Sequence, residues 1–242
     1  MKRIIYFFSI LLLICILIIS GYFIYINLKE NKKQEEIFEE LINIIETTDE
    51  EQEIDLFSLY KINNDIVGWI RIENTTLDYP VMQSDIENYY LRRNFYKEYS
   101  SYGTPYLAYN CDLNSDNLII YGHHMNNRKM FGCLEDYKTK SFYEENKTIC
   151  FYILNNEKTI KSEYEIFAVF KTTVYNSNSF KYYSYIDFDD ENEFSLFITE
   201  VKNLSMYETD IVPQYGDNFI TLSTCEYSNK NSRLVIMAKK TN

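Results

Sequence analysis

The chain has 242 residues, of which 46% are hydrophobic and 25% charged, so a packed core is expected. Its net charge of −12 makes a nucleic-acid partner unexpected, because phosphate backbones reward basic surfaces. Tyrosine (24 residues) and phenylalanine (16) are abundant, whereas glycine (6) and proline (3) are scarce. This balance favours strands over a helical bundle and argues against flexible linkers or collagen-like segments.

No metal or cofactor is predicted. The histidines His123 and His124 are adjacent, no C-x-x-C pair occurs, and no Gly-rich phosphate loop is present. The spacing of the cysteines resembles no dense disulfide framework, so most are expected to be unpaired. The cysteines are Cys15, Cys111, Cys133, Cys150 and Cys225.

Residues 4–26 carry no charge and follow a short basic tail at residues 1–3. A bilayer core needs about 20 helical residues, whereas a signal peptide has an apolar region of about 7–15 and then a small-residue cleavage site. No such site follows, so the segment predicts an uncleaved transmembrane anchor. Basic residues flank both ends, so charge barely discriminates the orientation; we expect a cytoplasmic N-terminus and an extracellular domain.

Residues 27–55 are rich in Glu and Lys and predict a helical stalk. Apolar residues recur there at helical spacing. They are Ile37, Phe38, Leu41, Ile42 and Ile45. Asp49 is a candidate cap for a second short helix that ends at Leu59. A partner-binding coiled coil is the alternative, but the pattern lasts barely two heptads.

Residues 56–242 predict one mainly β domain. Runs rich in β-branched and aromatic residues cover 66–72, 79–83, 106–109, 118–121, 148–154, 159–174, 219–224 and 234–238. Short helices are expected near 87–95 and 129–137, and a clearer one with an apolar stripe at 191–202. About eight strands with few helices predict a closed or nearly closed β-barrel.

A thiol, an imidazole and a guanidinium stand at the ends of these predicted strands. Cys225 ends the strand at 219–224, His123 and His124 follow the strand at 118–121, and Arg233 begins the last strand. A thiol nucleophile needs a thiolate, a proton shuttle and a stabiliser of the oxyanion. If strands 219–224 and 234–238 pair, Arg233 returns close to Cys225. On residue type alone, a buried core cysteine and an ordinary surface arginine remain open alternatives.

These motifs resemble the sortases, membrane-anchored cysteine transpeptidases of Gram-positive bacteria. The resemblance rests on TLSTC at residues 221–225 with Arg233 downstream, and on YGHHM at residues 121–125. NNDIVGWI at residues 63–70, YPVMQ at residues 79–83 and the helix-containing insertion at 191–202 resemble class B sortases in particular. The resemblance extends from about residue 56 to the C-terminus.

The resemblance implies an eight-stranded sortase β-barrel with short peripheral helices, and a peptidase of the cysteine type. Cys225 would attack the Thr–Gly bond of an xPxTG-like C-terminal sorting signal on a secreted protein. An amine of a cell-wall peptide would resolve the thioester. The histidine directly after glycine is catalytic in sortases, which assigns His123 as general acid/base, and Arg233 matches the arginine that stabilises the oxyanion. Because neighbours on a strand face opposite sides, His124 would face outward or support the site from behind.

Looser similarity suggests four substrate-binding residues: Ser223, Glu226, Leu91 and Tyr183. A strand hydroxyl, a solvated acid and core packing are equally open interpretations of these residues. Asn110 and Asp112 are expected to form a turn, and a calcium site like that of some class A sortases is not indicated.

Three other functions remain open. An L,D-transpeptidase-like enzyme would carry S-H-G-C around its nucleophile, whereas this chain has L-S-T-C. A cysteine endopeptidase would use the same site with water in place of the amine. A membrane-anchored β-domain that only binds would need no thiolate, so replacement of Cys225 would leave its activity unchanged.

Overall fold

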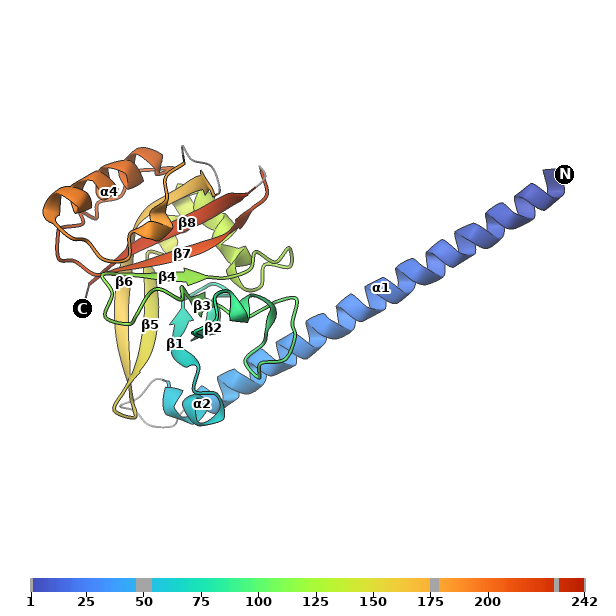
Figure 1. Ribbon diagram of the computed structural model, residues 1–242, viewed down its shortest axis with the longest axis horizontal. Coiled ribbons are helices and arrows are strands. Elements are labelled where there is room, and N and C mark those ends of the chain that lie inside the picture. The colour runs from blue at the N-terminus through green and yellow to red at the C-terminus, as the bar shows by residue number, and fades with distance from the viewer. Residues whose placement is uncertain (1, 47–53, 175–178, 229–230, 242) are drawn as a thin grey trace. The chain divides into compact units, whose positions relative to one another are not determined.

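The computed structural model describes residues 2–46, 54–174, 179–228 and 231–241 (Figure 1). These residues fall into two compact units, Met1–Asn43 and Ile44–Asn242. The first unit is helical, and the second contains all the strands of the described chain.

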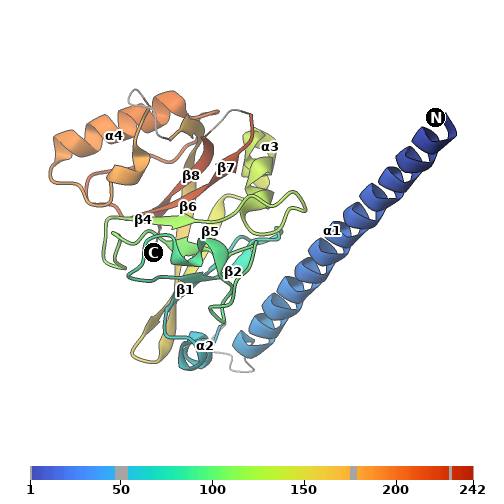
Figure 2. The same ribbon diagram turned by 45° about the vertical axis from the view of Figure 1, so that its right-hand side comes forward.

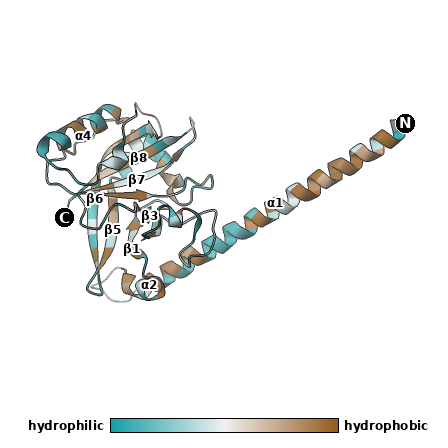
Figure 3. Ribbon diagram, viewed as in Figure 1, coloured by the Kyte–Doolittle hydropathy of each residue, from teal (hydrophilic) through white to brown (hydrophobic). Residues whose placement is uncertain are grey.

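Helix α1 runs without a break over Lys2–Ile45, so the expected anchor and the start of the expected stalk form one helix. Its N-terminal part is mostly hydrophobic, its middle part is polar, and its last turns are mixed (Figure 3). Among the described residues it is the one helix that is long and apolar enough to cross a membrane. The proposed cap Asp49 lies outside the described residues. The described second helix, α2 (Leu56–Ile62), is capped instead by Asp55, whose carboxylate accepts a hydrogen bond of 3.2 Å from the Ser58 amide.

The strands close into a barrel in the order β1-β2-β3-β4-β7-β8-β6-β5 (Figures 1 and 2). The first four are β1 (Ile66–Arg71), β2 (Asp78–Met82), β3 (Tyr106–Leu107) and β4 (Asn117–Tyr121). The others are β5 (Thr148–Asn155), β6 (Lys158–Thr173), β7 (Phe219–Glu226) and β8 (Ser232–Lys240). Each strand lies at a place that the β-rich runs predicted, and the predicted eight-stranded barrel is confirmed.

Two parallel pairings interrupt an otherwise antiparallel barrel. Strand β2 pairs in parallel with β3, and β4 pairs in parallel with β7. A parallel pair needs a long connection between its strands, and nearly a hundred residues separate β4 from β7 along the chain. The barrel therefore brings the end of β4, with its histidines, beside the end of β7, with Cys225.

Short helices occupy the connections. They are η1 (Tyr89–Arg92), η2 (Phe131–Lys138), α3 (Lys140–Glu145), η3 (Tyr182–Ser184) and α4 (Glu191–Leu204). Three lie where helices were predicted, although η1 and η2 are 3₁₀ rather than α-helical, while α3 and η3 had no clear sequence pattern. Helix α4 begins after Asp190, whose carboxylate caps the Glu193 amide at 2.9 Å.

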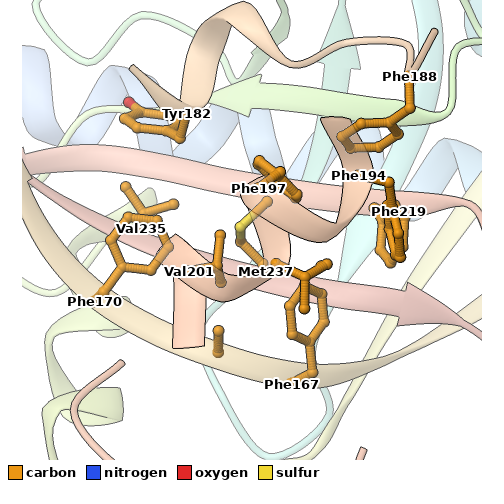
Figure 4. Close-up of a cluster of buried hydrophobic side chains, with 12 residues drawn as sticks. Phe167, Phe170, Tyr182, Phe188, Phe194, Phe197, Val201, Phe219, Val235 and Met237 are labelled. Carbon is orange, nitrogen blue, oxygen red and sulfur yellow. The ribbon is translucent and has the colours of Figure 1, made fainter. Parts of the chain in front are cut away.

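The apolar stripe of α4 covers the outer side of the barrel beside β6 and β8 (Figures 1 and 4). Phe197 and Val201 from the helix meet Phe170, Val235 and Met237 from the strands, and all five are buried. Phenylalanine and tyrosine rings around α4 pack edge-to-face or tilted on one another, an arrangement typical of aromatic cores. This cluster also packs against residues of η3, and η3 lines a cleft at the end of the barrel strands.

Candidate active site

Strands β7 and β8 place Cys225 directly opposite Arg233. The antiparallel register pairs these two residues near the end of both strands, as the sequence predicted. Opposite residues in an antiparallel pair have Cβ atoms about 4.5–5.5 Å apart and share one face of the sheet. The Cys225 thiol and the Arg233 guanidinium therefore start from the same face of the barrel wall.

The parallel pairing of β4 with β7 brings the histidine segment to the same end. Tyr121 lies opposite Ser223, and the Gly122 amide donates a 3.2 Å hydrogen bond to the Ser223 carbonyl. The Thr224 hydroxyl donates a 2.8 Å hydrogen bond to the Gly122 carbonyl. These bonds fix the backbone just before His123 against the backbone just before Cys225.

One cleft of about 640 Å³ contains all three candidate residues, Cys225, His123 and Arg233. Cys225 is half-buried, so its thiol is accessible from the cleft. The cleft lining combines aromatic and apolar side chains with polar ones, as ligand-binding clefts do. The aromatic side chains of this lining are Tyr106, Tyr109, Tyr121, Tyr182 and Tyr183.

His123 lies beside the η1 segment. Its Nε2 atom lies 2.7 Å from the Leu91 carbonyl oxygen, and because a carbonyl only accepts, Nε2 carries the proton. Nδ1 is then the ring nitrogen that can accept a proton. Burial lowers the pKa of His123 below 6.5; the Leu91 hydrogen bond opposes this shift and the charge of Arg92 adds to it. The imidazole is therefore neutral at neutral pH and suited to act as a base.

His124 does not line the cleft, as predicted. Strand alternation is not the reason, because β4 already ends at Tyr121. Its side chain is only 11% exposed, so it does not face solvent. Its Nδ1 atom lies 3.1 Å from the Cys225 carbonyl oxygen. Cys225 thus shares the cleft with His123, while its backbone carbonyl bonds to His124.

Three of the four suggested substrate-binding residues, Ser223, Leu91 and Tyr183, line the cleft. Ser223 is almost fully buried, and its hydroxyl shares a 2.6 Å hydrogen bond with the Tyr182 hydroxyl. Leu91 supplies both a cleft-lining side chain and the carbonyl that holds His123.

The fourth residue, Glu226, lies outside the cleft lining. Its carboxylate is buried and accepts a 2.7 Å hydrogen bond from Lys138, with Lys171 at 3.7 Å and Ser228 also bonded to it. Burial alone would raise the pKa of Glu226, but the bonds from Lys138 and Ser228 outweigh it and lower the pKa to about 2. Because successive strand residues face opposite sides, the acid beside the nucleophile ties the barrel to η2 instead of facing the cleft.

Apart from Tyr183, sequence reasoning missed the tyrosines that form much of the cleft wall. Tyr121 lies two residues before His123, and both line the cleft. The alternation of side chains along a strand could therefore have predicted Tyr121. Tyr106 and Tyr182 come from a two-residue strand and a 3₁₀ turn, where no periodic pattern exists. Burial raises the pKa of Tyr182 to about 12, so its hydroxyl stays protonated beside the Ser223 hydroxyl.

No disulfide joins the cysteines, all of which lie in the described chain. Cys111 and Cys133 are buried, and burial raises the pKa of each thiol. Asp112 caps a turn by accepting a 2.7 Å bond from the Asn114 amide, as predicted. Within the residues that the structure describes, no three His, Cys, Asp or Glu side chains gather as metal ligands would.

A closed β-barrel that brings a thiol, an imidazole and a guanidinium to one cleft is typical of cysteine enzymes that transfer acyl groups. The sortase domain family matches residues 70–241. Sortase B of Staphylococcus aureus is 35% identical over 95% of this chain and 93% of its own. Sortase B of Listeria monocytogenes is 32% identical over 95% of this chain and 94% of its own.

The solved structures agree. The Staphylococcus aureus sortase B–substrate complex superposes with a TM-score of 0.68 and 36% identity, over 76% of this chain and 83% of that one. The chain therefore belongs to the sortase family of cysteine transpeptidases, in its class B.

Proposed function

We propose that this chain is a membrane-anchored sortase that cleaves the Thr–Gly bond of an xPxTG-like sorting signal and transfers the secreted protein to a cell-wall peptide amine. The observation that carries this proposal is the convergence of Cys225, His123 and Arg233 on one cleft. The likeness to a sortase B that has been solved with its substrate supports peptide binding in that cleft.

In the first half-reaction the Cys225 thiol gives its proton to Nδ1 of His123, and Sγ attacks the threonine carbonyl carbon while the carbonyl electrons move to the oxygen. Arg233 donates hydrogen bonds to this oxyanion from the opposite strand. The carbonyl then re-forms, the carbon–nitrogen bond breaks, and His123 gives the proton that it took from the thiol to the glycine-side amine that leaves. The product is a thioester between the threonine and Cys225.

In the second half-reaction His123 takes a proton from the acceptor amine, which attacks the thioester carbon. The carbon–sulfur bond breaks, a new amide forms, and His123 passes the proton from the amine to Sγ, which restores the Cys225 thiol. Water in the place of the amine would give hydrolysis by the same residues. Substrate contacts along the cleft are assigned to Ser223, Leu91 and Tyr183, which line it.

The chain organisation follows the same proposal. Residues 1–3 are a cytoplasmic tail, residues 4–26 the single membrane span, residues 27–55 the stalk and residues 56–242 the extracellular catalytic domain. The long apolar start of α1 supports the anchor. No cofactor or metal takes part, because the thiol, the imidazole and the guanidinium supply the nucleophile, the acid/base and the charge stabilisation.

The test uses the detergent-solubilised full chain and a library of peptides that end in xPxTG-like signals, with and without an amine acceptor. We expect cleavage after threonine, a mass shift on Cys225 from the thioester, and a ligated product only when the amine is present. Cys225→Ala should abolish all three. Hydrolysis without ligation would favour an endopeptidase, and no cleavage of any peptide by folded protein would favour a binding domain.

A further inference from the structure

His124 is held inside the protein by contacts that the reaction scheme does not use. It forms an isolated β-bridge with Met130, and its side chain is only 11% exposed. It does not line the cleft, so it cannot touch a substrate bound there. Its polar contacts are instead made with the segment that carries the nucleophile.

The Nδ1 atom of His124 bonds to the nucleophile's own backbone. It lies 3.1 Å from the Cys225 carbonyl oxygen, and because that oxygen only accepts, Nδ1 is the donor. The nearest Glu135 carboxylate oxygen lies 3.8 Å from the same nitrogen, beyond hydrogen-bond distance. The Cys225 carbonyl is therefore the hydrogen-bond acceptor for this nitrogen.

Two further contacts join Tyr227 to His124. The Tyr227 hydroxyl donates a 3.0 Å hydrogen bond to the His124 carbonyl oxygen. The two rings meet edge to face at 5.0 Å between centroids. His124 is thus bound through both its ring and its backbone to residues on either side of Glu226, which is itself anchored by Lys138.

We propose that His124 is a positioning residue, whose Nδ1–H holds the Cys225 carbonyl so that the thiol stays aligned with His123. Cys225 lies near the end of β7, where the ladder with β4 has already stopped at the Tyr121–Ser223 pair. The His124 bond replaces the missing cross-strand bond on that side. Because His124 directly follows His123 in the chain, its bond to Cys225 also fixes the position of His123 relative to Cys225.

This inference rests on the proposed function, in which Cys225 is the nucleophile and His123 the acid/base. A misplaced nucleophile lowers the rate of attack more than it lowers substrate binding. Loss of the His124 bond should therefore reduce kcat for acylation with little change in KM.

The experiment compares three substitutions in the solubilised full chain. In His124→Asn the amide nitrogen stands the same number of bonds from Cβ as Nδ1, so it can still donate to Cys225. In His124→Gln the amide is one bond further out, and His124→Leu fills the space without a donor. We expect kcat to fall about fivefold to tenfold in the Gln and Leu variants and to stay within about twofold in the Asn variant.

A second measurement needs no sorting peptide. The alkylation rate of Cys225 by iodoacetamide, followed by peptide mass spectrometry, should change in the Gln and Leu variants and be restored in the Asn variant. Thermal unfolding of each variant controls for a general loss of fold. Equal losses in Asn and Gln, or no change in either measurement for the Leu variant, would overturn the proposal. If the wild-type chain cleaves no peptide, the proposed function fails, while the alkylation pattern still tests the positioning.

Discussion

Adjacent residues in this site make different contacts because their surroundings differ. His123 lies in the cleft with its Nε2 on the Leu91 carbonyl, while His124 contacts the Cys225 carbonyl from outside the cleft. Cys225 lines the cleft and the next residue, Glu226, pairs with Lys138 away from it. At the scale of single residues, the neighbours decide which group faces the cleft.

The lowered pKa of His123 predicts where its imidazole titrates. Burial disfavours the charged ring, so the unfolded chain binds this proton more tightly than the folded one. The stabilising effect of the neutral ring is present above about pH 6.5 and is lost as the pH falls through the folded pKa. An NMR titration of the two histidines, assigned with His124→Gln, should show His123 titrating below 6.5. A value above 6.5 would contradict the burial argument.

The pKa of about 2 for Glu226 predicts a pH-dependent contribution to stability. Because the unfolded carboxyl binds its proton near 4.5, stabilisation by the ion pair is complete above that pH and is lost as the pH falls toward 2. Glu226→Gln should lower the free energy of unfolding by about 1–3 kcal/mol at neutral pH, and by much less in strong acid. Chemical unfolding across pH measures this difference. The exposed Glu145→Gln variant is the control and should change stability by less than about 0.5 kcal/mol.

At the scale of elements, the parallel pairing of β4 and β7 brings the histidine segment to the nucleophile. The pairing ends at Tyr121 and Ser223, and Gly122 then passes close to η2. A Cβ atom on Gly122 would lie 2.6 Å from the ring of Phe131, which is fully buried. The strand, the glycine and the 3₁₀ helix therefore together position His123.

This close approach predicts that Gly122→Ala is damaging. The added methyl group must displace Phe131 or the backbone of His123, and such overpacking costs about 1–3 kcal/mol of stability. Peptide cleavage should fall further than stability alone explains, because His123 moves relative to Cys225. Thermal unfolding and cleavage rates check both effects. Gly21→Ala, where a Cβ atom meets nothing within 4 Å, is the matched control and should be neutral in both.

At the scale of the whole molecule, the chain combines a long apolar helix with a closed barrel. Closure gives every barrel strand of the described chain a paired strand on both sides. The apolar part of α1 is exposed along its length. For example, Leu12 is 62% exposed and Ile16 is 49% exposed. Such a surface is stable in lipid and not in water.

Membrane attachment is therefore expected to depend on the start of α1. The double variant Leu12→Lys and Ile16→Lys adds two charges to the span, at about 2.5–3.5 kcal/mol each. It should leave the membrane fraction on carbonate extraction, whereas the wild-type chain stays. The double variant Leu12→Val and Ile16→Val keeps the span apolar and is the control. Retention of the lysine variant would contradict a transmembrane anchor in α1.

Much of the fold could be predicted because its signals are local. Alternating and β-branched runs located the strands, and the apolar stripe of residues 191–202 located α4. The short elements η3 and α3 could not be predicted, since a turn of three to six residues has too little periodicity. The continuous course of α1 through Ile45 was also missed, because the change from apolar to charged residues suggested two segments.

The sequence by itself determined the membrane-span candidate and the barrel strands. It placed Arg233 close to Cys225 only on the condition that strands 219–224 and 234–238 pair, which the structure then showed. Only the tertiary structure decided what depends on residues far apart in the chain. Glu226 bonds to Lys138, 88 positions away, and the Ser223 hydroxyl meets Tyr182, 41 positions away. No local pattern contains such contacts, because they exist only when the closed barrel has brought its connections together.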